Sequence, residues 1–353
     1  MCHMWQRSDP DMSLDKIKEI LASSSIKNTL INLVPTGGEP TLREDLPEIF
    51  GYAFQHIRSL RYTGFFTNSL LPERARVIAG KALDLKEKFG RKEILFSVGL
   101  SLDGYGKTHD EIRGVKGAFG KVMENYLGLK ALTKKYGFYI GFNFVVQKEN
   151  IAGGNALFML DVAEQALLPV IFPIVYGKDI FYNMECSDDW GIGEELKRDT
   201  IDFYEEVVRR AEKGRLLVDN GSYYRDVLIQ LRGTQRSLPC LFREKKACVI
   251  DADGSVYLCD LTRESLLGNI YEKPFDEIWN SAQKDVAYNK ILPYCSKCFS
   301  NCAVGSGRYQ LRQIWNSKGL SGLTGLSYKE AKKRIYRLAR LIEEYKYVIW
   351  PRL

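Results

Sequence analysis

The sequence predicts an α/β protein in which a run of parallel βαβ units is followed by a small cysteine-rich module. Two observations lead to this prediction. In the first half of the chain, short apolar segments alternate with longer helix-like segments, which is typical of a parallel sheet. In the second half, six of the eight cysteines lie between Cys240 and Cys302, both included.

The expected strands are short apolar segments, at 30–34, 60–66, 94–102, 138–146 and 169–175. The expected helices are one before the first strand, at 11–23, and four between the strands, at 46–54, 72–89, 120–136 and 155–167. Ser13 is expected to cap the first helix, and Pro72 suits the first turn of the third. Two further helices, 192–213 and 223–232, lead to the cysteine module, and an amphipathic helix at 328–345 follows it.

Polar side chains and glycines follow the carboxyl ends of the expected strands. Residues 36–40 (Thr-Gly-Gly-Glu-Pro) follow the first strand, 67–68 (Thr-Asn) the second, and 101–104 (Ser-Leu-Asp-Gly) the third. In barrels built from such units, ligands bind at this edge of the sheet. The two glycines allow a ligand to approach the backbone closely, and Glu39 can accept a cation such as an ammonium group. By itself, Gly-Gly-Glu-Pro is equally consistent with a simple turn.

Composition restricts the class of protein. The chain has 353 residues, of which 45% are hydrophobic and 27% charged, as in soluble globular proteins. No apolar run approaches the roughly 18 residues of a membrane span, and the N-terminus does not resemble a secretory signal. The net charge of +7 is spread along the chain and does not demand nucleic acid. We therefore expect a cytoplasmic protein without a membrane or nucleic-acid partner.

The cysteine module is predicted to bind metal. Residues 248–259 are expected to form a β-hairpin with its turn at 252–254, and Cys295, Cys298 and Cys302 form a close cluster further on. In a cytosolic protein, such a set indicates metal binding rather than disulfides. All-thiolate sites suit zinc or an iron–sulfur cluster, and spacing alone does not separate them.

Taken together, these motifs resemble those of the radical S-adenosylmethionine (SAM) enzymes with a C-terminal SPASM domain. The resemblance covers about residues 1–305. The matching segments are 37–40, 67–68, 101–104 and 109–114 in the α/β part, and 248–259, 267–270, 275–279 and 295–302 in the cysteine module.

The resemblance implies a partial (β/α)6 TIM-like barrel that lacks its first strand, a small α+β SPASM module and a C-terminal helix. The implied domains are the partial barrel at 1–188, a helical linker at 189–236, the SPASM domain at 237–305 and a helical tail at 306–353. The implied activity is hydrogen abstraction by a 5′-deoxyadenosyl radical. The substrate would be a peptide, a protein or a small cofactor precursor, and the electrons would come from a reductant such as ferredoxin or flavodoxin.

The resemblance also implies a SAM site, made of Gly37, Gly38, Glu39, Pro40, Ser101, Asp103, Arg113 and Asn143. Glu39 would accept the methionyl ammonium group, and Arg113 would bind the SAM carboxylate with its fork of donors. Ser101 and Asp103 would contact the ribose or the methionyl end, and Asn143 would line the adenosine site.

Two iron–sulfur clusters are implied by the same resemblance. The SAM-binding 4Fe–4S cluster is held in the family by Cys-x3-Cys-x2-Cys, and Cys2 matches the third cysteine. Because the positions of the other two would precede Met1, we expect this motif to be incomplete in the chain. An inactive or zinc-stabilised binding protein is therefore the alternative interpretation.

One auxiliary 4Fe–4S cluster is expected in the SPASM module, because six thiolates cannot supply four ligands to each of two clusters. The first choice of ligands is Cys248, Cys259, Cys295 and Cys298. The alternates are Cys240 and Cys302.

Overall fold

The computed structural model describes residues 10–165, 168–175, 192–216, 221–296 and 298–301. Cys2, Cys302 and the helix expected at 328–345 lie outside the described residues. The first part of the chain contains a five-stranded parallel sheet in the order β1-β2-β3-β4-β5, which confirms the α/β prediction. The strands are β1 (Asn32–Leu33), β2 (Tyr62–Thr67), β3 (Leu95–Ser101), β4 (Tyr139–Asn143) and β5 (Val170–Ile171).

The longer helices before and between these strands are close to those expected. The helices of this part of the chain are α1 (Leu14–Ala22), α2 (Ser24–Lys27), α3 (Leu46–His56), α4 (Pro72–Lys88), α5 (Lys107–Arg113), α6 (Ala118–Tyr136), α7 (Lys148–Ile151) and α8 (Asn155–Gln165). Ser13 caps α1 as predicted, since its Oγ accepts a hydrogen bond from the Lys16 amide at 3.2 Å. The pattern did not predict α2, α5 and α7, because each is too short to show a helical period.

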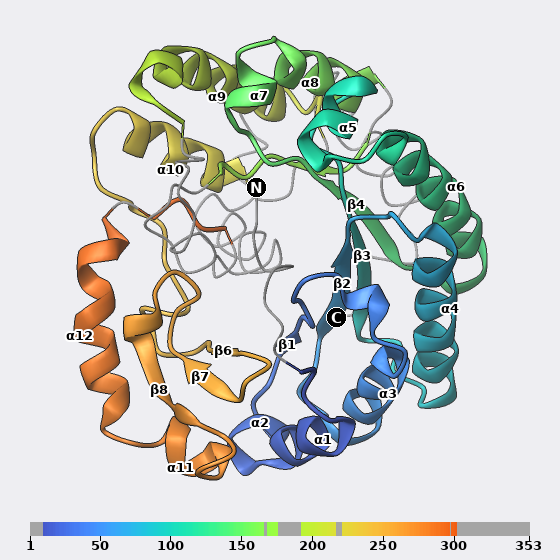
Figure 1. Ribbon diagram of the computed structural model, residues 1–353, viewed down its shortest axis with the longest axis vertical. Helices are drawn as coiled ribbons and strands as arrows, with labels where there is room; N and C mark the ends of the chain where they lie inside the picture. The colour runs from blue at the N-terminus through green and yellow to red at the C-terminus, as the bar shows by residue number, and fades with distance from the viewer. Residues whose placement is uncertain (1–9, 166–167, 176–191, 217–220, 297, 302–353) are drawn as a thin grey trace, which may run out of the picture.

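Aromatic side chains fill the space between the sheet and its helices, and Figure 1 shows α3, α4 and α6 along the same side of the strands. Phe50 of α3 is fully buried and meets Phe96 of β3 edge to face, with 5.4 Å between ring centroids. Burial of such large rings supplies much of the energy that holds the helices on the sheet. No helix in the described part of the chain has both the length and the apolar character needed to cross a membrane.

Strand β5 is shorter than predicted because proline interrupts it. Proline has no N–H to give to a neighbouring strand, and Pro173 lies within the expected segment. The Pro173 carbonyl still accepts from the Val146 amide at 2.7 Å, and an isolated parallel bridge joins Val146 to Ile174. After β5, the chain thus continues beside the residues that follow β4, but without regular strand pairing.

Two further helices follow, α9 (Lys197–Glu212) and α10 (Gly221–Leu231). Their tyrosine hydroxyls hydrogen-bond the backbone next to β5, at the outer edge of the sheet. The Phe172 amide donates to the Tyr224 hydroxyl at 3.1 Å, and the Tyr204 hydroxyl donates to the Phe172 carbonyl at 3.0 Å. Tyr223 donates its hydroxyl to the Phe299 carbonyl at 2.9 Å. Because buried backbone groups need partners, these phenols hold the edge strand and tie the cysteine module to it.

The cysteine module is a three-stranded antiparallel sheet with two helices. Its elements are β6 (Val249–Ile250), β7 (Ser255–Tyr257), β8 (Leu266–Asn269), α11 (Phe275–Trp279) and α12 (Gln283–Cys295). The predicted hairpin is confirmed. Gly254 in its turn has φ of +86°, and a Cβ there would lie 2.5 Å from the Tyr271 ring, so the turn needs glycine.

The module also meets the start of the chain, so that the described elements close into a ring (Figure 1). Asp276 of α11 accepts hydrogen bonds from the amides of Ser24 and Ser25, at 2.9 and 2.8 Å, and from the Ser24 hydroxyl at 2.9 Å. These groups lie at the start of α2, where backbone amides have no partner within the helix. One carboxylate therefore joins segments that are 251 residues apart or more.

Candidate functional site

The Gly-Gly-Glu segment lies where predicted, directly after β1. Gly37 has φ of +146°, and a Cβ on either Gly37 or Gly38 would meet nothing within 4 Å, so the backbone here is open to a ligand. Oε1 of Glu39 accepts from the hydroxyl and amide of Thr41 at 2.6 and 3.2 Å, and Oε2 accepts from the Asn68 amide at 2.7 Å. The half-buried carboxylate thus spans the ends of β1 and β2. Each oxygen has two lone pairs, so Glu39 can still accept from a cation.

Ser101 and Asn143 end two neighbouring strands. They are register partners at the last positions of β3 and β4, and both are half-buried. The parallel register therefore brings these two predicted site residues side by side at the carboxyl edge of the sheet, in line with the Glu39 loop.

Asp103 is fully buried just beyond β3, and its carboxylate is held by the protein itself. Its Oδ1 accepts from the Val145 amide at 3.1 Å, and its Oδ2 lies 2.5 Å from Nη2 of Arg113. The Arg113 side chain is 22% exposed, so part of the guanidinium can reach a ligand. The structure thus brings together Asp103 and Arg113, which the sequence had assigned to separate contacts.

Two residues that the sequence did not assign to the site complete this arrangement. His109 of α5 accepts the Asp103 amide on Nδ1 at 3.0 Å, and Asn150 donates to the carbonyls of Asp103 and Val145 at 3.0 and 2.7 Å. Burial lowers the pKa of His109 to about 4, although the Asp103 charge opposes this. His109 is therefore neutral at physiological pH. The sequence signal that could have identified His109 is its place in the 109–114 segment, which matches the family.

In the cysteine module, the structure associates Cys240 with Cys259, Cys295 and Cys298. Burial raises the pKa of the Cys259 thiol, and the charges of Asp260, Cys298 and Cys240 act in the same direction. Burial likewise raises the pKa of Cys298 to about 11 and that of Cys295 above its usual value, and Cys240 adds to both. Cys240 therefore acts on the thiols of Cys259, Cys295 and Cys298, and Cys298 also acts on that of Cys259.

Cys248 differs from these four. Burial raises the pKa of its thiol to about 12, and the neighbouring charge is that of Lys284 rather than that of another cysteine. The regular hairpin pairing joins Val249 to Tyr257 and Ile250 to Val256, so both Cys248 and Cys259 lie just outside the paired residues.

The cysteine thiols of this module suit a metal ion or an iron–sulfur cluster. Buried thiols with raised pKa values stay protonated unless a cation replaces the proton, and metal ligation requires the thiolate. Within the described residues, no three cysteine, histidine or acidic side chains converge on a position for one metal ion, and Cys302 lies outside those residues.

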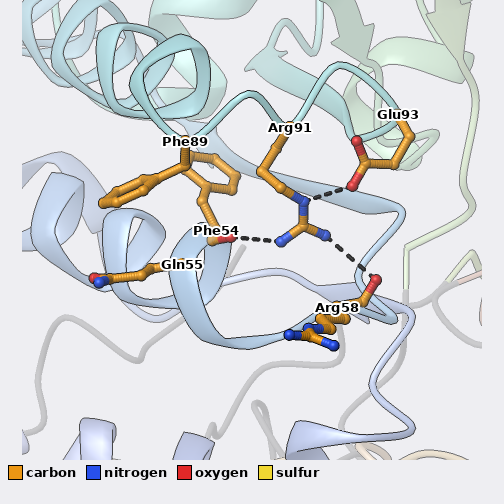
Figure 2. A pocket seen from close by; sticks show the side chains of 6 residues that line it. All are labelled: Phe54, Gln55, Arg58, Phe89, Arg91 and Glu93. Carbon is orange, nitrogen blue, oxygen red and sulfur yellow. Dashed lines mark hydrogen bonds and ion pairs between the residues drawn. The ribbon is translucent and has the colours of Figure 1, made fainter.

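A pocket of about 250 Å³ lies at the other end of the sheet, before β2 and β3 (Figure 2). Figure 2 shows Arg91 directed at Glu93 and at the backbone carbonyls that end α3. Its Nη2 donates to the Ile57 carbonyl at 3.0 Å. Because these donors are occupied, and because the amino-terminal edge of such a sheet usually serves stability, this pocket belongs to the scaffold.

Comparison with known proteins agrees with these features. The SPASM family, described as an iron-sulfur cluster-binding domain, matches residues 240–303. The pre-heme d1 synthase of Dinoroseobacter shibae is 34% identical over 307 residues, which are 80% of this chain and 70% of that protein. The Fe-coproporphyrin III synthase of Methanosarcina barkeri is 30% identical over 271 residues, which are 71% of this chain. The chain spans only 62% of the length of that second relative.

A solved structure shares the fold. The chain resembles native anSMEcpe with bound AdoMet and Cp18Cys peptide, with a TM-score of 0.55 and 18% identity over 87% of this chain and 89% of the other. The chain belongs to the radical SAM enzymes that carry a SPASM domain. Its relatives in this family include heme synthases and maturases.

Proposed function

We propose that the chain is a radical SAM enzyme that removes a hydrogen atom from a porphyrin-type cofactor precursor, with electrons from a one-electron reductant such as ferredoxin or flavodoxin. The observation that supports this proposal most is the position of the Glu39 carboxylate. It bonds Thr41 and the Asn68 amide, and the backbone of Gly37 and Gly38 beside it has free space around it. Gly37, Gly38 and Glu39 would hold SAM there, and the SAM would supply the 5′-deoxyadenosyl radical chemistry of this family. The proposed scaffold is a partial (β/α)6 barrel in residues 1–188, with the linker, SPASM module and tail at 189–236, 237–305 and 306–353.

Within this site, the chain's own residues bind and orient SAM. Glu39 accepts the methionyl ammonium, next to Gly37 and Gly38. Arg113 binds the carboxylate through the part of its guanidinium that Asp103 does not occupy. Both carboxylate oxygens of the buried Asp103 have partners in the protein, the Val145 amide and Arg113. Asp103 therefore positions Arg113 in this proposal, instead of contacting SAM as the resemblance implied.

In the SPASM module, the proposed ligands of the auxiliary cluster are Cys240, Cys259, Cys295 and Cys298. The effect of Cys240 on the thiol pKa values of the other three supports this set over the first choice of the sequence, because the charge that acts on Cys248 is that of Lys284 and not that of a cysteine. Cys2 and Cys302 keep their proposed roles as a ligand of the SAM-binding cluster and an alternate auxiliary ligand.

The substrate class is proposed from the relatives. The pre-heme d1 and Fe-coproporphyrin III synthases are at least 30% identical to this chain, which favours a porphyrin-type precursor. A peptide is the second candidate, because the sulfatase-maturating relative of Clostridium novyi is 28% identical and the solved neighbour carries a peptide.

SAM binding tests the site directly. Glu39→Ala should weaken SAM affinity at least tenfold in equilibrium dialysis, because an ammonium loses its charged acceptor. The control is Glu44→Gln, whose carboxylate is exposed on the same loop. Equal SAM affinity for Glu39→Ala and Glu44→Gln, with both variants folded, would exclude the proposed contact.

Metal analysis tests the module. After anaerobic reconstitution, the chain should contain iron and sulfide, Cys259→Ser should lose them and Cys248→Ala should keep them. Stoichiometric zinc without iron or sulfide would instead favour the zinc-stabilised binding protein. Loss of iron in Cys248→Ala alone would restore the ligand set first expected from the sequence.

A further inference from the structure

A buried arginine outside the matched SPASM segment contacts one of the four thiols. Arg236 is only 9% exposed, and its Nη1 lies 3.1 Å from the sulfur of Cys298. The same nitrogen donates to the carbonyls of Cys298 and Ser300, at 3.1 and 2.9 Å. The Ser300 amide also donates to the Cys298 sulfur at 3.3 Å. This sulfur therefore receives two N–H donors, one of them charged.

The arginine is held in place by helix α10. Asp226 is 2% exposed, and its Oδ1 accepts from the Ser237 amide at 2.6 Å, from the Ser237 hydroxyl at 2.7 Å and from the Leu238 amide at 3.2 Å. These bonds fix the backbone directly after Arg236. The guanidinium is thus a preorganised charge rather than a flexible surface side chain.

A buried carboxylate lies beside another of the four thiols. Asp260 is 8% exposed, and its Oδ1 lies 3.8 Å from the sulfur of Cys259. The charges of Asp260 and Arg236 act in opposite directions on the thiol of Cys298, where Arg236 lowers the pKa and Asp260 raises it. Two of the four proposed ligand thiols therefore have a charged side chain beside them, a cation at Cys298 and an anion at Cys259.

We infer that Arg236 raises, and Asp260 lowers, the reduction potential of the iron–sulfur cluster held by Cys240, Cys259, Cys295 and Cys298. The inference rests on the proposed function, since it requires that cluster. Reduction brings in one electron from an external reductant and changes no covalent bond. It makes the site one unit more negative, so a nearby buried cation and N–H···S bonds stabilise the reduced state, while a buried anion destabilises it.

The test is a redox titration of the full, anaerobically reconstituted chain, with dithionite as titrant and electron paramagnetic resonance as readout. The signal followed is the one that Cys259→Ser removes. In Arg236→Gln, the ratio of reduced to oxidised cluster at a fixed potential should fall about tenfold, which is about 59 mV for one electron. In Asp260→Asn the ratio should rise. Arg225→Gln, an exposed arginine of α10, should leave it unchanged.

The opposite signs separate this role from a purely structural one, because two variants that merely loosened the site would not shift the potential in opposite directions. Unchanged potentials with full iron and sulfide, or shifts of the same sign, overturn the inference alone. If Arg236→Gln loses the cluster, the inference is tested by Asp260→Asn alone. A reduction potential that does not rise in Asp260→Asn then overturns the inference. A reconstituted chain without iron and sulfide overturns the proposed function and the inference with it.

Discussion

The Asp276 carboxylate makes several of the contacts that close the ring of elements, so Asp276 is a sharp test of how the SPASM module is fixed to α2. Replacing Asp276 with alanine removes three hydrogen bonds to the start of α2, two from backbone amides and one from a hydroxyl. Loss of a helix N-cap side chain costs about 0.5–2 kcal/mol, and bonds to a charged acceptor lie at the upper end of the usual range. Asp276 is only partly buried, so we expect a loss of about 1–2 kcal/mol in the free energy of unfolding.

Urea unfolding measures this loss, and pH provides a second check. Hydrogen bonds from Ser25 and Ser24 lower the pKa of Asp276 to about 2, against about 3.9 in an unfolded chain. A depressed carboxyl pKa stabilises the fold above the unfolded value, so the contribution is complete above about pH 4 and is lost as the pH falls through about 2. Asp285 forms an exposed ion pair with Lys245 in the same module, so Asp285→Asn should lower the free energy of unfolding by less than about 0.5 kcal/mol. Equal losses for Asp276→Ala and Asp285→Asn would refute the reasoning.

Two more predictions concern a buried histidine and a strained glycine. Because His109 has a pKa of about 4 in the fold and about 6.5 when unfolded, the free energy of unfolding should fall by up to about 3 kcal/mol between pH 6.5 and 4. His109→Asn keeps an acceptor but does not titrate, and urea unfolding at pH 7 and 5 should show a flatter dependence; an unchanged slope would contradict the assignment. Gly254→Val should cost more than about 2 kcal/mol, because a β-branched residue is strained at φ of +86° and its Cβ overlaps the Tyr271 ring. Gly120→Ala, where space is open, should be neutral or stabilising, and similar melting curves for the two variants would disprove the strain.

Local pattern was enough to predict the strands whose ends carry most of the proposed SAM site. Alternating apolar and helical segments predicted all five described strands of the sheet, and the polar residues after them fell at one edge because parallel strands share their direction. The hairpin at 248–259 also followed from pattern, since Gly254 provides the positive φ that its turn requires. These features depend on neighbours in sequence, which is why sequence was sufficient.

The pairing of side chains across the fold was decided by tertiary structure. Cys248 and Cys259 flank one hairpin, yet the charges that act on the Cys259 thiol include that of Cys240, whereas the charge that acts on Cys248 is that of Lys284. Asp103 and Arg113 meet because α5 folds back toward the residues that follow β3, where His109 also bonds the Asp103 amide. Arg236 reaches Cys298 across 62 residues because α10 holds its backbone. Sequence thus determined the family and the kind of chemistry, while packing decided which charge lies against which ligand, because that depends on contacts no local pattern encodes.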